Sequence, residues 1–166
     1  MQVARTLSTA RLALRQPHAD DLSAYTAYCA SDRAVHVGGP FDAPTAFNRF
    51  AAMIGHWALR GFGRYVMEHE GRAVGHVGPL HLTDQTAPEL SWTIWNGADE
   101  GKGFATEAAR AVVDHLLDRI GWTELLIRVA PENTGSRRIA EKLGARAGQP
   151  PAFDRYPGAL TYRIAA

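Results

Sequence analysis

The stretch Glu100-Gly101-Lys102-Gly103-Phe104-Ala105-Thr106 decides the fold, because it joins a strand predicted at residues 89–95 to a helix predicted at 104–120. Gly101 and Gly103 remove side chains just where the helix begins, so backbone N–H groups are left uncovered. The first turn of a helix also carries the positive end of the helix dipole. A phosphate can therefore be held there by backbone alone, and the glycines let it approach closely.

Two nucleotide-binding patterns can be tested against this spacing, and neither fits. A Walker A loop needs Gly, four residues and then Gly-Lys-Ser/Thr, whereas Gly97 precedes Gly101 by too few residues and Gly103 follows Lys102. A dinucleotide fingerprint needs Gly or Ala where Thr106 stands, and the preceding strands alternate like antiparallel neighbours. The loop is then either an anion site of another kind or a plain connection that tolerates glycine.

The rest of the chain is predicted to alternate between strands and helices in the order β, α, α, β, β, β, α, β, α, β. The assignments rest on period-2 alternation for strands, three-four spacing of apolar residues for helices, and Gly, Pro or Asn at the boundaries. The predicted elements are strands at 11–15, 62–68, 73–80, 89–95, 124–129 and 160–164, and helices at 17–29, 47–58, 104–120 and 133–143.

The bulk composition predicts one folded domain over residues 1–166. Hydrophobic residues make up 46% and charged residues 21%, which is close to the globular average and far from the signature of disorder. The formal charge of +1 comes without a basic run, so nucleic acid is not expected as a partner. The N-terminus lacks a signal-peptide pattern and no window approaches the ~18 apolar residues of a membrane span, so we expect a cytoplasmic protein without a membrane partner.

Cysteine and histidine usage argues against a metal centre or a disulfide. Cys29 is the only cysteine, so an intramolecular disulfide is excluded and a reducing compartment is expected. The seven histidines are scattered, and no His-Glu-x-x-His pattern occurs. We therefore predict no metal site.

The glycine loop followed by Ala105-Thr106-Glu107-Ala108 resembles the acetyl-CoA loop of the GNAT superfamily of N-acetyltransferases, whose pattern is Gln/Arg-x-x-Gly-x-Gly/Ala. Gly103 and Ala105 match this pattern, while Glu100 occupies its Gln/Arg position. Further matches cover most of the chain, at 11–15, 56–63 and 133–138, and the nearest subgroup resembles ribosomal-protein N-terminal acetyltransferases.

The resemblance implies an α+β fold with a mixed, mostly antiparallel sheet flanked by helices on both faces. It also implies acetyl-CoA as co-substrate, entering where the strand at 89–95 splays away from the strand at 124–129. An acid at position 100 neither donates to a phosphate nor balances its charge, so Glu100 is expected to point to solvent, with Lys102 supplying the cationic contact. The cofactor-binding residues implied are Thr93, Ile94, Trp95, Gly101, Lys102, Gly103, Phe104, Ala105, Thr106, Asn133 and Arg138.

Acetyl transfer to an amine requires a group that removes a proton, because the amine has a pKa of about 8 to 10. Glu89 falls where several superfamily members place a general-base glutamate, and an N–H near Ile94 or Trp95 is suited to stabilise the oxyanion. Many members use a tyrosine to protonate the leaving thiolate, but Ala140 stands at that position. The ribosomal-type subgroup carries a serine where this chain has Ser136, which is therefore predicted to be the donor. Glu89 and Ser136 also have purely structural interpretations, as a strand-edge charge and a small helix residue.

The acceptor is expected to be a primary amine, either of a protein N-terminus or of a small molecule, and a homodimer is compatible with the resemblance. Residues that select the acceptor are expected in the loops at 36–42, 80–88 and 149–157, with Tyr156, Asp154 and His81 as candidates. The alternative function is a non-catalytic acyl-CoA-binding sensor or interaction module, which Ala140 and Glu100 favour.

Overall fold

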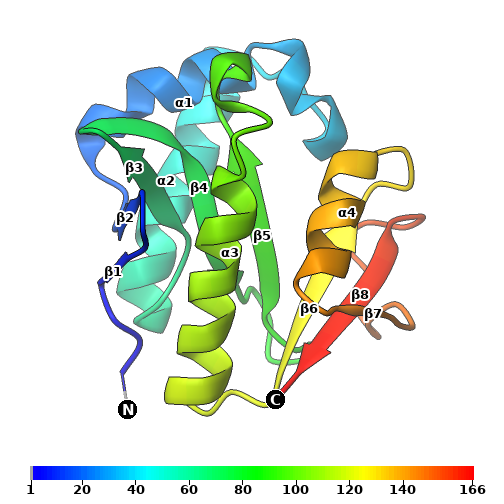
Figure 1. Cartoon of the computed structure of the whole chain (residues 1–166). Helices are drawn as coiled ribbons and strands as arrows, with labels where there is room; N and C mark the ends of the chain where they lie inside the picture. The colour runs from blue at the N-terminus through cyan, green and yellow to red at the C-terminus, as the bar shows by residue number, and fades with distance from the viewer. Residues whose placement is uncertain (1) are drawn as a thin grey trace.

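A computed structural model describes residues 2–166 and contains one eight-stranded sheet (Figure 1). The strand order is β1-β2-β3-β4-β5-β6-β8-β7, and every neighbouring pair is antiparallel except β5 and β6, which are parallel. This sheet is the mixed, mostly antiparallel one predicted. The strands are β1 Thr6–Ser8, β2 Ala13–Arg15, β3 Tyr65–His69, β4 Arg72–Leu80, β5 Glu89–Ile94, β6 Glu124–Val129, β7 Arg146–Ala147 and β8 Leu160–Ala165.

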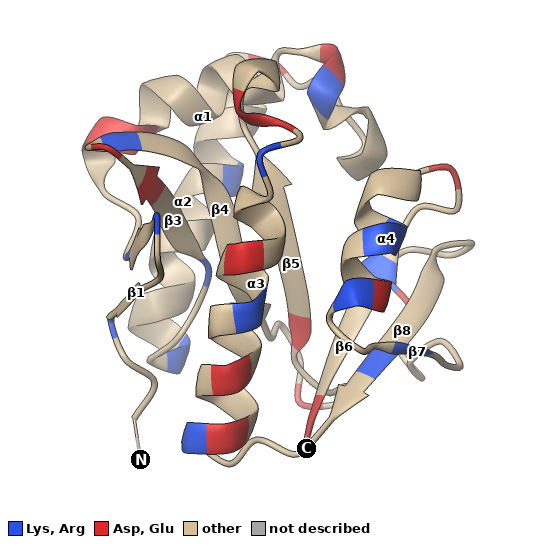
Figure 2. Ribbon diagram, in the orientation of Figure 1, with Lys and Arg blue, Asp and Glu red and all other residues tan. Residues whose placement is uncertain are grey.

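Helices cover both faces of the sheet, as predicted. On one face, α1 (Leu22–Cys29) and α2 (Ala43–Arg60) pack together over Val66 and Trp95 of the sheet region. On the other face, α3 (Phe104–Asp114) lies over β4 and β5, and α4 (Thr134–Lys142) lies over β6. The outer side of α3 is charged, and basic and acidic residues are interspersed over the elements rather than gathered by sign (Figure 2).

Local sequence signals explain where α2 begins and ends. The Asp42 carboxylate accepts a hydrogen bond from the Thr45 N–H at 2.9 Å, which satisfies one of the free donors of the first turn. Gly61 follows the last turn with φ of 74°, a left-handed conformation that glycine adopts without strain. The helix buries Ala46, Phe50, Met53, His56 and Trp57, which are spaced three or four apart along one side.

The parallel contact between β5 and β6 is confined to one end of the two strands. Glu89 pairs with Leu126, and the Leu126 N–H donates to the Pro88 carbonyl at 2.9 Å. Beyond this point β5 keeps its antiparallel partner β4 over its whole length, whereas β6 pairs with β8 on its other side. The edge of β5 toward β6 is therefore open from Leu90 onward, which is the predicted splay.

Short elements without strong periodicity differ from the sequence prediction. β1 and β7 are additional strands, and a 3-10 turn at Asp32–Val37 follows α1. The helix predicted over 104–120 changes at His115 into a π-helical turn, closed by an Ile120 N–H bond to the His115 carbonyl. The His115 ring at that turn accepts a hydrogen bond from the Ala4 N–H, a long-range contact that local spacing cannot show. Within residues 2–166, no helix is both long and apolar enough to span a bilayer.

The close approach of β4 to β5 requires glycine at position 75, which gives a test of this packing. A Cβ atom on Gly75 would lie 2.1 Å from the Thr93 carbonyl oxygen and 2.8 Å from the Met67 methyl group. Gly75→Ala is therefore expected to lower the free energy of unfolding by about 2–3 kcal/mol, measured by urea denaturation. Gly55→Ala is the matched control, because a Cβ there meets nothing within 4 Å and the change should stabilise α2 by about 0.5–1 kcal/mol. Equal effects of the two substitutions would contradict the packing described here.

Candidate functional site

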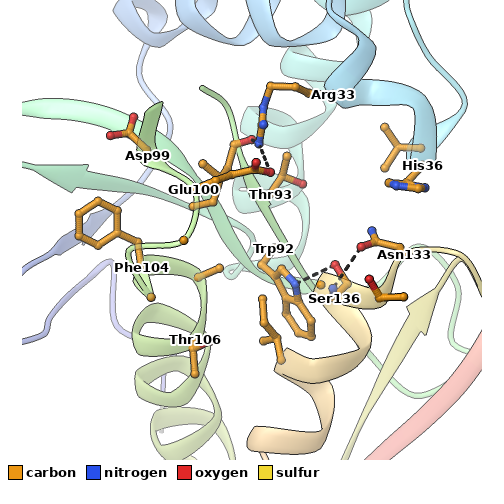
Figure 3. A pocket seen from close by; sticks show the side chains of 18 of the residues that line it. Arg33, His36, Trp92, Thr93, Asp99, Glu100, Phe104, Thr106, Asn133 and Ser136 are labelled. Atoms are coloured by element: carbon orange, nitrogen blue, oxygen red, sulfur yellow. Dashed lines mark hydrogen bonds and ion pairs between the residues drawn. The ribbon is translucent and has the colours of Figure 1, made fainter. Parts of the chain in front are cut away.

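A cavity of about 630 Å³ occupies the splay, between the open edge of β5, the N-terminus of α3 and the first turns of α4 (Figure 3). It contains most of the residues that the sequence singled out for cofactor binding. Those that line it are Thr93, Ile94, Gly101, Gly103, Phe104, Ala105, Thr106 and Asn133, and Ser136, predicted as a catalytic residue, lines it too. Trp95, Lys102 and Arg138 do not line it.

The N-terminus of α3 presents free backbone donors to this cavity. Gly103 is the residue before the helix and provides no side-chain cap, and the first helical bond runs from the Glu107 N–H to the Gly103 carbonyl at 3.0 Å. The N–H groups of Phe104, Ala105 and Thr106 consequently have no acceptor within the helix. Gly101 and Gly103 have φ of 71° and 81°, a region where other residues are strained. The loop therefore presents free backbone donors at the positive end of the helix dipole, the feature from which the sequence predicts an anion site.

The loop is held in place by a buried carboxylate, Asp99, whose side chain is 0% exposed. Arg72 donates two hydrogen bonds of 2.8 Å to its two oxygens, and the Lys102 amine lies 3.5 Å from one of them. These contacts hold the pKa of Asp99 below its ordinary value, chiefly through the Arg72 hydrogen bonds. Lys102 is thus directed to Asp99 and does not line the cavity, and its role as the cationic contact stays a prediction.

The Glu100 side chain is 61% exposed, in agreement with the prediction that it points to solvent, and it also lines the cavity in an ion pair. Its carboxylate accepts a hydrogen bond of 2.7 Å from Arg33 Nη2, which also donates to the Ile94 carbonyl at 2.9 Å (Figure 3). The Arg33 hydrogen bond lowers the pKa of Glu100. The cation of this region therefore comes from the turn after α1, far away in sequence, and it bridges the glycine loop to β5.

Alternate residues of β5 direct their backbone N–H groups into the splay. The Trp95 N–H donates to the Val74 carbonyl at 2.9 Å. In an antiparallel pair, hydrogen-bonded and non-bonded positions alternate, so Thr93 also bonds to β4, and Trp92 and Ile94 direct their N–H groups toward β6. Trp95 is therefore unavailable as an oxyanion donor, and its buried indole donates to His76 at 2.9 Å on the opposite face. Ile94 therefore has a free N–H on this edge, whereas Trp95 does not line the first cavity and its role in cofactor binding stays a prediction.

The start of α4 brings polar groups to the other wall of the cavity. The Asn133 side chain caps the helix by accepting the Ser136 N–H at 3.1 Å, which is the structural role expected for asparagine at this position. The Ser136 hydroxyl accepts a hydrogen bond from the Trp92 indole at 3.3 Å, so it lies directly across the splay from β5 (Figure 3). Arg138 is exposed on the outer side of α4, away from these residues.

A second cavity of about 450 Å³ continues from the first on the α1 and α2 side of the sheet. The two share Trp92, Thr93 and Ser136, among others, and the second also contains Glu89. Burial raises the pKa of the Glu89 carboxyl, although the nearby cations Arg155, Arg128 and Arg64 oppose the shift. A carboxyl with a raised pKa in a cavity is suited to accept and return a proton.

Of the acceptor-side candidates, Tyr156 lines the second cavity, whereas Asp154 and His81 do not. Asp154 forms an ion pair of 2.8 Å with Arg128, which lowers the pKa of its carboxyl. The His81 N–H donates instead to the His56 ring at 3.0 Å. Among residues 2–166, no group of three or more His, Cys, Asp and Glu side chains is arranged to hold a metal ion.

Several residues that line the two cavities were not found from the sequence. Arg33 comes from the turn after α1 and Tyr28 from α1 itself, where no recognisable motif marks them, whereas His36 lies in the loop at 36–42 that was expected to contact the acceptor. Arg49 and Arg64, in α2 and just before β3, line only the second cavity. These residues reach the cavities through long-range packing, and no local pattern in the sequence indicates that they do.

Comparison with known proteins agrees with this geometry. Residues 11–146 match the family model described as the acetyltransferase (GNAT) domain, and the chain belongs to this family. An acetyltransferase from Agrobacterium tumefaciens has the same fold, with a TM-score of 0.89 and 32% identity over 98% of this chain and 95% of that one. RimL, a ribosomal alpha-N-protein acetyltransferase solved in complex with coenzyme A, shares the fold at a TM-score of 0.77 and 14% identity, over 96% of this chain and 97% of that one.

Curated relatives match over a shorter segment. The N-acetyltransferase YnaD of Bacillus subtilis, described as uncharacterized, is 26% identical over 81 residues. That segment is 49% of this chain and 47% of YnaD, so the chain spans about half the length of the curated relatives it matches.

The Asp99 ion pair gives a prediction for stability and its pH dependence. A carboxyl whose folded pKa is lowered stabilises the fold above its unfolded pKa, and this contribution disappears as the pH falls through the folded value. Asp99→Asn is therefore expected to cost about 1–3 kcal/mol at pH 7 and to reduce the loss of stability below about pH 4. Thermal unfolding between pH 2 and 8 measures both. Asp20→Asn is the control, because the Asp20 side chain is 91% exposed. Identical pH profiles for wild type and Asp99→Asn would contradict this role.

Proposed function

We propose that the chain is an acetyl-CoA-dependent N-acetyltransferase, acting as a single domain on the primary amine of a protein N-terminus or a small molecule. The observation that carries this proposal is the continuity of the two cavities through the splay. One end offers the uncapped N-terminus of α3 and the other holds the buried carboxyl of Glu89. The ribosomal acetyltransferase of the same fold, solved with coenzyme A, supports this choice of co-substrate.

Each part of the first cavity suits one part of acetyl-CoA. The N–H groups of Phe104, Ala105 and Thr106 are free to bind the pyrophosphate at the positive end of the helix dipole. The amide-rich pantetheine arm can pair as an added strand with the open backbone edge of β5 at Trp92 and Ile94. The thioester would then lie where the two cavities meet, next to Ser136.

The residues at this junction supply the steps of a direct transfer. Glu89, acting itself or through a water, takes the proton from the acceptor amine, which then attacks the thioester carbonyl. A backbone N–H on the open edge of β5 stabilises the oxyanion that forms. As the carbon–sulfur bond breaks, the Ser136 hydroxyl stabilises the departing thiolate, and the acetyl group remains on the amine.

The first test is release of the coenzyme A thiol from acetyl-CoA in the presence of amines of several classes. Glu89→Gln is expected to lower kcat by about 100-fold or more, with little change in KM for acetyl-CoA, because Glu89 does not line the first cavity. In the wild type, kcat should fall as the pH drops through a pKa above the ordinary 4.5 of glutamic acid, and Glu89→Gln should lose this limb.

The other carboxylate that lines the second cavity, Glu132, is the rival base. Its side chain is 70% exposed, so Glu132→Gln should change kcat little. A larger effect at Glu132 than at Glu89 would assign the base to Glu132. Stabilisation by acetyl-CoA without thiol release for any amine would instead indicate a binding module.

Because Glu100 pairs with Arg33 beside the proposed phosphate site, removal of this acid is expected to increase the affinity for coenzyme A. The Glu100 carboxylate lies beside the proposed phosphate site and occupies Arg33, so Glu100→Gln should remove repulsion and release a cation. We expect the Kd for coenzyme A to fall by about two- to tenfold, in line with the modest energies of exposed charges, and to rise for Arg33→Gln. Isothermal titration at two salt concentrations measures both. Weaker binding by Glu100→Gln would show that the acid contributes to the site.

A further inference from the structure

Two arginines that line the second cavity have no carboxylate partner, unlike Arg128, which lines the same cavity. Arg15, Arg33, Arg72, Arg128 and Arg163 each form an ion pair with Asp or Glu. Arg49 and Arg64 line the second cavity, and no carboxylate among residues 2–166 forms an ion pair with either. Both are only partly exposed, so solvent does not fully replace the missing partner.

The Arg49 guanidinium is held in a fixed position with a hydrogen-bonding group left unused. It lies over the Phe41 ring, 4.4 Å from the centroid, and its Nε is buried without a hydrogen-bond partner. Stacking on an aromatic ring uses the face of the guanidinium and leaves its N–H edge available. Such an edge matches the two oxygens of a carboxylate.

Arg64 has a second positive charge, that of Arg49, close by, and forms no ion pair with a carboxylate among residues 2–166. Burial lowers the pKa of its guanidinium, and the charge of Arg49 lowers it further, although Tyr25 opposes this. Glu89 lines the same cavity but forms no ion pair with Arg64, and burial raises the pKa of its carboxyl although Arg64 opposes the shift. Two like charges in a partly buried cavity cost free energy, and an anionic ligand between them would offset that cost.

The strand that floors this cavity also has an unused polar group. The Ser91 hydroxyl is buried without a hydrogen-bond partner, and Ser91 lies between Glu89 and Thr93 on the same side of β5. His76 adds no charge here, since burial holds its pKa well below the ordinary value and its ring accepts the Trp95 indole hydrogen. The cavity therefore combines two unpaired cations and a free hydroxyl with the carboxyl of Glu89.

We propose that the acceptor is a small amino-acid-type molecule, whose carboxylate binds Arg49 and Arg64 while its amine is directed to Glu89. This inference rests on the proposed function and names the substrate class of the same site. A cavity of about 450 Å³ is within the range that encloses a small molecule. A polyamine would bring a second positive charge to the two arginines and is disfavoured.

The test compares acceptors that differ only in the anionic group. α-Amino acids, the matching α-amino acid amides and spermidine are supplied with acetyl-CoA, and thiol release is measured. The acids should give a kcat/KM about 10- to 100-fold above that of the amides, in line with the energy of hydrogen bonds to a charged group. Amides or spermidine used as well as the acids would overturn this inference and leave the acetyltransferase assignment intact.

Variants then assign the preference to the two arginines. Arg49→Gln and Arg64→Gln should each raise KM for the acid about 10-fold or more, leaving KM for the amide and for acetyl-CoA unchanged. Arg60→Gln is the matched control on α2, because Arg60 pairs with the exposed Asp84 outside the cavity. An equal loss for acid and amide would contradict recognition of the carboxylate.

A binding measurement separates the failure of this inference from the failure of the proposed function. If no amine releases the thiol, the proposed transfer is wrong, and the melting temperature is measured with N-acetyl amino acids and their amides. A higher melting temperature with the N-acetyl amino acid in the wild type, absent in the Arg49→Gln, Arg64→Gln double variant, would support the anion site even though no acetyl group is transferred. No rise with any of the acids, together with no use of amino acids as acceptors, would overturn the inference.

Discussion

The site depends on the point where the parallel pairing of β5 and β6 stops. After Glu89 and Leu126 the two strands separate, and β5 retains hydrogen bonds only to β4. An open strand edge inside a protein is normally an uncompensated cost, because its N–H and C=O groups lack partners. In this fold the edge lines a cavity, where an amide-containing ligand can supply the missing hydrogen bonds. The gap between the strands also connects the cavities on the two faces of the sheet. A cofactor bound in one cavity can therefore contact an acceptor bound in the other.

Ion pairs decide which cations can reach a ligand in this opening. Asp99 holds Arg72 and Lys102, and Glu100 holds Arg33, so the glycine loop presents backbone N–H groups rather than free cationic side chains. On the far side of β5, Arg128 is paired with Asp154. Arg49 and Arg64 are left unpaired in the second cavity. The side proposed for the acceptor therefore holds two guanidinium groups that no carboxylate among residues 2–166 pairs with.

Local signals predicted the fold and the loop well, because they depend on neighbouring residues. The glycines before Phe104 and the three-four spacing of α3 specify a strand, loop and helix without long-range information. The side to which the Trp95 N–H points could not be predicted from the sequence, because it depends on the pairing of β5 with β4, in which this N–H donates to Val74. Arg33 enters the site from the turn after α1 and Arg49 from α2, and no spacing in the sequence relates them to β5.

Amide hydrogen exchange on binding coenzyme A tests most directly whether the splay receives the cofactor. Free donors should gain protection when the ligand binds, whereas amides already bonded within the sheet should not change. We expect slower exchange at Ala105, Thr106 and Ile94, with Thr93 and Trp95 unaffected. Protection confined to other elements, with Ile94 and the first turn of α3 unchanged, would contradict this account of the site.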